Sequence, residues 1–316
     1  GRALVEERVP RPAGARLQRW LLKSFIPRRG LFAVAVALGR ALRPLLPASL
    51  SAKLPARRDA GAWPEPRHPR RMLVMEGCVQ PSMAPSIDPA AARVLDRLGI
   101  SLVRVPRGRC CGAVAYHLEY QEDGLDYARG NIDAWWPHLE AGAEALVITA
   151  SGCSTQVKEY GHLLSHDPAY AAKAARVSAL ARDVSEVVAA ERAALAALPK
   201  STQGPAKIAF HSPCSLQHGL KLAGVVESIL REAGFILTPV PDAHLCCGSA
   251  GTYSLLHPHI SKDLRRNKLD ALESGGPQQI ATANIGCLSH LDAAARVPVR
   301  HWIELLDARL APVQQE

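Results

Sequence analysis

All eight cysteines of this 316-residue chain fall into one pattern that occurs twice. Each copy has a single cysteine and then, after 31 intervening residues, an adjacent pair of cysteines followed by glycine. A fourth cysteine follows the pair after 41 intervening residues in the first copy and after 39 in the second. The two sets are Cys78, Cys110, Cys111 and Cys153, and Cys214, Cys246, Cys247 and Cys287. Such an internal repeat predicts two similar structural units, each of which must accommodate four thiols.

Disulfides, zinc and iron–sulfur clusters are the chemistries that such a pattern could serve. Adjacent Cα atoms are about 3.8 Å apart, below the roughly 4.4–6.8 Å of an unstrained disulfide, so a bond within either pair would be strained. Disulfides between more distant cysteines stay open, although 8 cysteines in 316 residues without a secretory signal do not resemble a secreted scaffold. Structural zinc sites prefer two ligands two to four residues apart, and no C-x-x-C occurs here. Buried, inert cysteines are a further alternative.

An iron–sulfur cluster accounts best for the pattern. Several iron atoms make such a cluster wide, so adjacent thiolates can reach different metal atoms, and a [4Fe–4S] centre needs four cysteines. One cluster per copy, or a single cluster shared between the copies, would satisfy this requirement. The sequence therefore predicts that all eight cysteines bind iron.

The order of the expected elements places each cysteine site just after a strand. Strands are expected over residues 72–75, 102–105, 145–149, 207–210, 235–240 and 279–283. Helices are expected over residues 89–98, 125–141, 225–233 and 262–272, and just after Cys153 and Cys287. This alternation predicts an α/β fold of two tandem βαβαβ units with parallel sheet and right-handed crossovers. Ligands of open α/β sheets collect beyond the carboxyl ends of the strands, where these cysteines would lie.

The chain divides into three expected regions. They are a basic helical leader and linker at 1–70, a first cysteine-rich domain at 71–200 and a second at 201–316. Within them we expect leader helices at 15–25 and 30–46, a proline-rich linker at 55–69, an alanine-rich helical segment at 169–198 and a connector at 199–205.

Positive charge is concentrated in the leader. Residues 1–71 contain 16 Arg or Lys and 4 Asp or Glu, a balance of +12, which leaves −3 for the remainder of a chain whose net charge is +9. Such a segment can face anionic lipid or an acidic partner, or it can be a solvated helical pair packed on the body. We expect no nucleic-acid binding, because the leader lacks interleaved aromatics and any nucleic-acid motif. With no signal peptide and no apolar run near 20 residues, we expect a cytoplasmic protein, with peripheral contact at the inner membrane face left open.

Glycines and histidines accompany the cysteines. Gly77, Gly112, Gly152, Gly248 and Gly286 would let backbone N–H groups approach sulfur, or simply permit tight turns. Six histidines could bind metal or carry protons, but with four cysteines per copy we favour surface or core positions for His117, His211, His218, His244, His257 and His259. Packing is the favoured role for Trp135 and Trp136. No G-x-G-x-x-G or P-loop motif occurs, so a flavin or nicotinamide is expected on another chain.

The doubled pattern resembles the CCG cysteine-rich family, which includes the cysteine-rich subunit of heterodisulfide reductase and the iron–sulfur subunits of complexes that oxidise 2-hydroxy acids, glycolate among them. The likeness lies in Glu76–Cys78, Asn131–Trp136, Thr149–Cys153, His244–Tyr253, Thr282–Cys287 and His301–Glu304. The resemblance implies an electron-transfer subunit. A partner flavin-containing glycolate oxidase subunit would oxidise glycolate to glyoxylate, and electrons would pass through one or two [4Fe–4S] clusters towards a quinone or other acceptor.

Two features depart from the family pattern. Members often end each copy with C-x-x-C, which supplies a fifth thiolate, whereas Ala150 or Gln156 stands where a partner to Cys153 is expected, so the cluster type stays open. Such subunits also usually begin with a ferredoxin-like domain carrying two C-x2-C-x2-C-x3-C-P runs, which this chain lacks. We expect that domain to be missing by truncation or by loss. A zinc-stabilised scaffold and a thiol–disulfide enzyme of the heterodisulfide reductase kind remain the alternatives.

Overall fold

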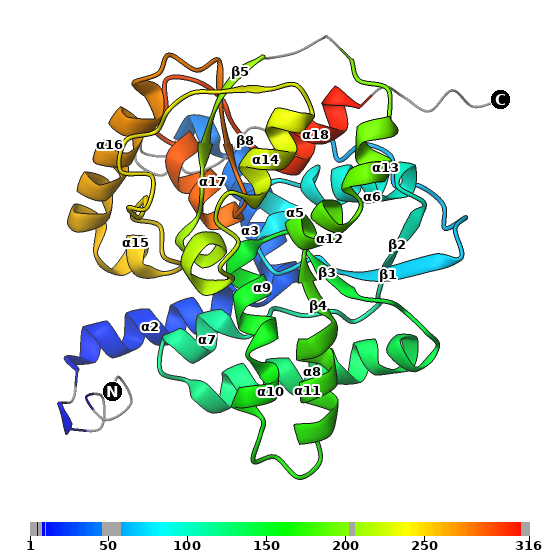
Figure 1. Ribbon diagram of the computed structural model, residues 1–316. Coiled ribbons are helices and arrows are strands. Elements are labelled where there is room, and N and C mark those ends of the chain that lie inside the picture. The colour runs from blue at the N-terminus through cyan, green and yellow to red at the C-terminus, as the bar shows by residue number, and fades with distance from the viewer. Residues whose placement is uncertain (1–4, 6–7, 10, 46–57, 202–205, 311–316) are drawn as a thin grey trace.

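Two four-stranded parallel sheets form the body of the protein (Figure 1). The computed structural model describes residues 5, 8–9, 11–45, 58–201 and 206–310. The first sheet has the order β2-β1-β3-β4, and the second has the matching order β6-β5-β7-β8. Their strands are β1 (Arg70–Met75), β2 (Ile100–Arg104), β3 (Leu146–Ile148), β4 (Ala181–Asp183), β5 (Lys207–His211), β6 (Ile236–Leu237), β7 (Gln279–Thr282) and β8 (Val299–His301). All six pairings are parallel, so the predicted fold class is confirmed.

Helices connect the strands in both halves. The first half contains α5 (Gln80–Met83), α6 (Ile87–Arg97), α7 (Ala113–His117), α8 (Gln121–Glu140), α9 (Ser151–Lys158), α10 (Tyr160–Leu163), α11 (Ala171–Leu180), α12 (Val184–Ala190) and α13 (Arg192–Ala197). The second half contains the π-helix η2 (Ser215–Gly219), α14 (Val225–Glu232), α15 (Tyr253–Leu256), α16 (Pro258–Glu273), α17 (Ile285–Asp292) and α18 (Trp302–Arg309). Each half therefore repeats the same order of elements, apart from the additional helices α10, α11 and α13.

Some predicted elements need correction. The segment 169–198 is not continuously helical, because β4 interrupts it between α11 and α12. The strand predicted at 235–240 is reduced to the two residues of β6. The helices expected just after Cys153 and Cys287 begin two residues before those cysteines, so each sulfur lies in a first helical turn. Part of the predicted linker and connector, at 55–57 and 202–205, lies outside the described residues, as does position 46 of the second leader helix.

Each face of the first sheet packs into a different apolar cluster. Side chains alternate along a strand, so Met72 and Val74 of β1 enter one cluster while Leu73 and Met75 enter the other. The first of these clusters continues into the second half, where it includes Ile208 of β5. The second cluster contains Cys78, Cys110 and Cys111 together with side chains of α8 and α11. The two halves are thus joined by shared apolar packing.

The two halves contact each other reciprocally, as two copies of a unit about a twofold axis do. Helix α6 packs on α18, and the equivalent pair α14 and α12 also pack together. Helix α9 contacts η2, and the equivalent pair α17 and α5 do the same. The carboxylate of Asp307 in α18 forms ion pairs with Arg93 and Arg97 of α6, with N–O distances of 2.6 and 2.7 Å. This arrangement brings the segments that follow β1, β3, β5 and β7 together at the boundary between the halves.

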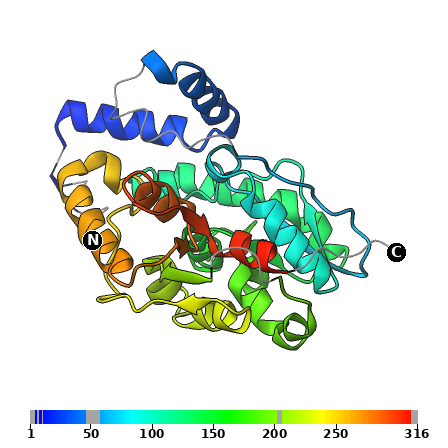
Figure 2. The same ribbon diagram turned by 90° about the horizontal axis from the view of Figure 1, so that it is seen from above.

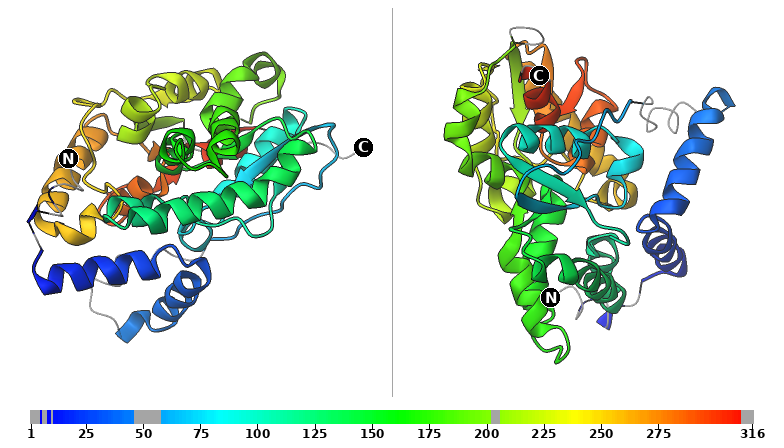
Figure 3. Two further views of the ribbon diagram at one scale, coloured as in Figure 1. Left: turned by 90° about the horizontal axis from the view of Figure 1, so that it is seen from below. Right: turned by 90° about the vertical axis from the view of Figure 1, so that its right-hand side faces the viewer.

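The leader forms a separate layer on one side of the body (Figure 2). It consists of α2 (Ala13–Phe25), α3 (Arg29–Ala41) and the 3₁₀-helix η1 (Arg43–Leu45). Helix α2 contacts α7 and α3 contacts α5, and an ion pair joins Lys23 to Asp123. The right-hand view of Figure 3 shows the same two helices standing apart from the sheets. Among the described residues, no helix is long and apolar enough to cross a bilayer.

Candidate metal centre

The glycine after each cysteine pair fixes the same backbone conformation in both halves. Gly112 has φ +87° and Gly248 has φ +88°, in the left-handed region that other residues enter only with strain. A Cβ atom at Gly112 would lie 2.5 Å from the carbonyl oxygen of Gly124, and one at Gly248 would lie 2.5 Å from that of Ser261. Only glycine therefore fits, and the two cysteine pairs are presented by equivalent turns.

The four cysteines of the first half form a chain of neighbouring thiols. The pKa of the Cys110 thiol is lowered because the thiols of Cys111 and Cys78 donate hydrogen bonds to it. The pKa values of Cys78 and Cys111 are raised, first by their interaction with Cys110 and then, for Cys111, by Cys153. One sulfur of the set therefore takes thiolate character at the expense of its neighbours. The structure brings together all four cysteines predicted for the first half.

The second half repeats this chain. Interaction with the thiols of Cys214 and Cys247 lowers the pKa of Cys246 to about 2, and the N–H of Gly248 donates to its Sγ at 3.3 Å. The pKa of Cys247 is raised by Cys246 and by Cys287, and that of Cys287 is lowered, first by Cys247. The backbone approach to sulfur expected of glycine is thus present at Gly248. All thiol contacts that dominate these shifts lie within one half.

Buried polar side chains, to which the sequence assigned no role of their own, hold the two cysteine loops. In the first half, Asn131 of α8 accepts from the N–H of Arg109 and donates to the carbonyl oxygen of Cys110, both at 2.8 Å. The Tyr160 hydroxyl donates to the carbonyl oxygen of Cys111 at 2.8 Å. Tyr160 also stacks on Trp135, with 6.4 Å between ring centroids, so Trp135 packs as expected. These bonds fix the backbone that carries the first pair.

In the second half, α16 supplies the corresponding support. Ser261 Oγ donates to the carbonyl oxygen of Gly248 at 2.8 Å. Lys268, only 3% exposed, donates its ammonium to the carbonyl oxygens of Asp242 and Ala243 at 2.8 and 3.3 Å. Burial lowers the pKa of Lys268, while the nearby thiolates oppose this shift. A buried positive charge thus lies beside the second set of cysteines.

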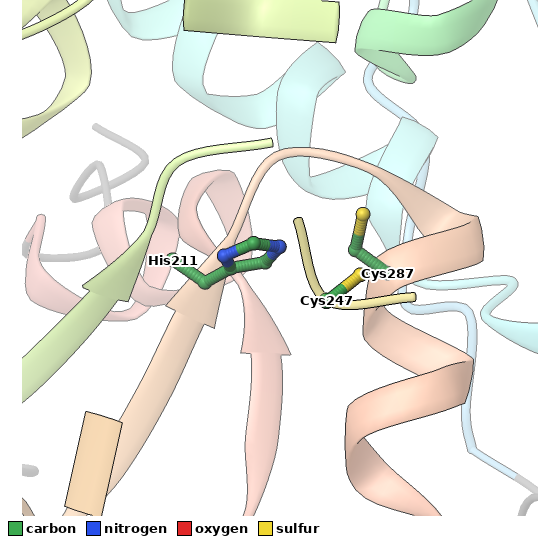
Figure 4. Close-up of side chains that lie close together, drawn as sticks. All are labelled: His211, Cys247 and Cys287. Carbon is green, nitrogen blue, oxygen red and sulfur yellow. The ribbon is translucent and has the colours of Figure 1, made fainter. Parts of the chain in front are cut away.

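One of the six candidate histidines lies with the cysteines. Figure 4 shows the His211 ring, at the end of β5, directed towards Cys247 and Cys287. One ring nitrogen and the two sulfurs lie within 4.8 Å of one another, and all three residues are buried. His211 is thus a core residue, as one of the two favoured positions predicted, but it also lies beside two of the cysteines. The other five are exposed, namely His117, His218, His244, His257 and His259.

The ends of the two cysteine sets approach each other across the boundary between the halves. Ser151, two residues before Cys153, places its Oγ 2.8 Å from that of Ser215, which follows Cys214. The backbone N–H of Ser151 donates to the carbonyl oxygen of Ala283 at 3.1 Å. The two sets are thus neighbours on adjoining segments, while the thiol contacts themselves stay within each set.

The fold and the doubled cysteine sets define a class of protein. The model of the CCG cysteine-rich domain matches residues 72–158 and 208–292, the two segments that contain the two sets. The chain belongs to this family. It is 53% identical over 98% of its length to the glycolate oxidase iron-sulfur subunit of Escherichia coli, of which it covers 75%. It is also 26% identical over 73% of its length to lactate utilization protein A of an Exiguobacterium species, of which it covers 94%.

A further relative has a similar name. Lactate utilization protein A of Bacillus pumilus is 27% identical over 73% of this chain, which covers 97% of it. Among solved structures, an aspartate racemase homologue from Pyrococcus horikoshii covers 75% of the chain with 13% identity and a TM-score of 0.28, a likeness too distant to bear on function.

Proposed function

We propose that this chain is an iron–sulfur electron-transfer subunit of a complex that oxidises a 2-hydroxy acid, with glycolate as the substrate. The observation that carries the proposal is the convergence of four cysteines in each half at the carboxyl ends of a parallel sheet. In this proposal the ligands are Cys78, Cys110, Cys111 and Cys153 in the domain at 71–200, and Cys214, Cys246, Cys247 and Cys287 in the domain at 201–316.

The residues present fit such a cluster. Metal ligands must be thiolates, and the arrangement already favours thiolate character at Cys110, Cys246 and Cys287 without a metal. The N–H of Gly248 and the ammonium of Lys268 place positive charge near the second set, which favours a buried anionic group. A bound iron–sulfur cluster would accept and release electrons, and we propose the [4Fe–4S] type with one cluster in each half.

The name of the Escherichia coli relative, an iron-sulfur subunit of glycolate oxidase, implies at least one further subunit in that complex. We propose that substrate oxidation takes place on a flavin-containing partner subunit, and that a quinone or another acceptor receives the electrons. The chain itself would then act as one subunit of an oxidoreductase and would not bind the hydroxy acid.

Metal analysis of the anaerobically purified full chain tests the proposal. We expect iron and acid-labile sulfide in near-equal amounts and an electron paramagnetic resonance (EPR) signal after reduction. Zinc without iron or sulfide would overturn the proposal in favour of a partner-binding scaffold, for which His211, Cys247 and Cys287 are a suitable donor set. Turnover of a disulfide with an artificial reductant would instead support an enzyme of the heterodisulfide reductase kind.

The leader offers a surface for membrane contact, and we propose that it binds anionic lipid. Helix α2 has no buried residue, and Leu17, Trp20 and Leu21 are exposed on one face of it. Helix α3 exposes Leu31, Val34 and Leu38, whose spacing of i, i+3 and i+7 also places them on one face. Amphipathic helices that combine apolar residues with arginine bind the interface of anionic membranes, and the leader carries the positive charge of this chain.

A further inference from the structure

The two halves differ at one position that faces their cysteines. Met75 ends β1 three residues before Cys78, and His211 ends β5 three residues before Cys214, so the two side chains occupy equivalent sites. Met75 is 3% exposed and His211 is 1% exposed. A thioether in an apolar cluster needs no partner, whereas an imidazole does. The repeat therefore places a group that can bind metal in one half and an apolar group in the other.

Among the described residues, neither ring nitrogen of His211 makes a hydrogen bond of ordinary geometry, although the ring interacts with the Cys287 thiol. Leaving a buried polar group without a hydrogen bond destabilises a protein. The nitrogen nevertheless lies within 4.8 Å of the sulfurs of Cys247 and Cys287. An imidazole nitrogen and two thiolates are all donors that iron accepts. A metal atom held between these three groups would use a nitrogen that makes no ordinary hydrogen bond within the described residues.

The two halves also differ in the charge of a side chain that supports the cysteine pair. Asn131 of α8 and Lys268 of α16 both donate to the backbone of the loop that carries a cysteine pair, the first to Cys110 and the second to Asp242 and Ala243. The first side chain is neutral and the second carries an ammonium group. A neutral imidazole ligand and a nearby cation both reduce the net negative charge of the second centre relative to the first.

We propose that His211 is a nitrogen ligand of the metal centre that Cys247 and Cys287 help to bind, so that the two centres of this chain are chemically inequivalent. This inference rests on the proposed iron–sulfur function and identifies one of its ligands. Because histidine ligation and nearby positive charge raise cluster potentials, the second centre has the higher reduction potential of the two. Electrons that enter the chain therefore rest preferentially in the second half.

Hyperfine spectroscopy of the reduced, full-length holoprotein tests this inference directly. With ¹⁵N-labelled histidine, we expect a strong coupling from one directly bound nitrogen. His211→Met, which introduces the residue used at the equivalent position of the first half, should abolish the coupling and lower the midpoint potential of one centre while the other stays unchanged. His290→Gln, at a histidine of α17 whose Nε2 lies 3.2 Å from Ser261 Oγ, should retain the coupling.

The outcomes separate the two proposals. A full complement of iron and sulfide without any strong nitrogen coupling in the parent protein overturns the role of His211 and leaves the proposed function standing. A coupling that survives in His211→Met, or disappears in His290→Gln, also overturns it. A protein without iron overturns the proposed function itself. The labelled parent protein gives this answer even where His211→Met fails to fold.

Discussion

His301 Nε2 lies 2.9 Å from the carbonyl oxygen of Thr149, and this contact joins the end of β8 in the second sheet to the residue that follows β3 in the first. Thr149 offers only an acceptor there, so Nε2 carries the proton. His301 Nδ1 then accepts the N–H of Ile303, 3.3 Å away, and caps α18. The side chain of Thr149 continues the connection, since its Oγ1 donates to Asp88 at 2.6 Å. A neutral histidine and a buried carboxyl group are thus linked through one threonine between the two cysteine sets.

Acid should weaken the protein through His301. Burial lowers its pKa to about 4, whereas an unfolded histidine titrates near 6.5, so the unfolded chain binds the proton first. The contribution of His301 to the free energy of unfolding should therefore fall as pH drops below about 6.5, by about 2 kcal/mol at pH 5. Urea denaturation between pH 7.5 and 5, compared between the parent holoprotein and a variant without this histidine, measures this contribution.

The variant His301→Asn isolates the effect of this histidine. Asparagine can cap α18 but cannot reproduce the bond to Thr149, so we expect a loss of about 1–3 kcal/mol at pH 7.5. The difference from the parent should shrink towards pH 5, because the titrating group has gone. His259→Asn, at an exposed histidine, serves as the control and should follow the parent curve. An undiminished difference at pH 5 would show that His301 does not carry the acid sensitivity.

Asp88 should make the free energy of unfolding depend on pH in the opposite direction from His301. Burial raises its pKa to about 7, against about 3.9 in an unfolded chain, so the folded protein holds a proton that the unfolded chain releases. The stabilising contribution of this group is lost as pH rises from about 4 to 7, and the loss amounts to about 2 kcal/mol between pH 5 and 7. Asp88→Asn stays uncharged, so it should unfold at higher denaturant concentration than the parent at pH 8 and gain less at pH 5. Asp270→Asn, at an exposed carboxylate, should show no such trend.

Replacing the glycine after a cysteine pair should disrupt one centre. Gly248→Ala adds a Cβ that would lie 2.5 Å from the carbonyl oxygen of Ser261, in addition to left-handed strain of about 1–3 kcal/mol. We expect the free energy of unfolding to fall by more than this strain energy. We also expect the variant to bind only about half as much iron as the parent. Gly224→Ala is a matched control, because Gly224 has φ +82° and nothing within 4 Å of the added Cβ. The control should keep its iron, and equal iron in both variants would contradict the packing argument.

Single cysteine substitutions should show whether there are one or two centres. The thiol contacts are confined to each half, so Cys110→Ser and Cys246→Ser should each remove about half of the iron and alter different EPR signals. The double variant should bind almost none. Complete iron loss from either single variant would mean that all eight cysteines serve one shared cluster.

The doubled cysteine spacing made the fold and the grouping of the cysteines predictable, because it repeats along with the strands that precede each cysteine site. The short outer strands could not be predicted in the same way. Ala181, Arg182 and Asp183 form β4 within an alanine-rich segment whose local preference is helical. They are extended because β3 offers an open edge for pairing, which is a tertiary effect. Three residues are also too few to show an alternating pattern.

The residues around the cysteines were harder to identify. His211, three residues before Cys214, was one of six candidate histidines, and aligning the two copies, where methionine stands in its place, could have separated it from the other five. Nothing in the sequence shows that neither of its nitrogens makes an ordinary hydrogen bond, since this depends on which groups surround β5. Lys268 is harder still, because lysine on a helix is usually exposed. Its burial follows from the loop before Cys246, whose carbonyl oxygens it binds.

The last prediction concerns the exposed apolar face of the leader. Leu17, Trp20 and Leu21 are 57%, 49% and 51% exposed, and the arginines of the leader can attract anionic headgroups. The full chain should therefore sediment with vesicles that contain phosphatidylglycerol and much less with vesicles of phosphatidylcholine alone. Burying two leucines contributes about 1.5–3 kcal/mol each, so the double substitution Leu17→Gln and Leu21→Gln should weaken binding at least tenfold.

The matched control for the vesicle assay lies on the body of the protein. Ile236 and Ile260 are 61% and 55% exposed, so replacing both with glutamine changes the same number of exposed apolar residues and should leave binding unchanged. High salt should weaken the binding of the parent chain, because it screens the arginines. If the parent chain stays in solution with anionic vesicles at low salt, the apolar face of α2 is a surface for a protein partner, and the proposed lipid contact is wrong.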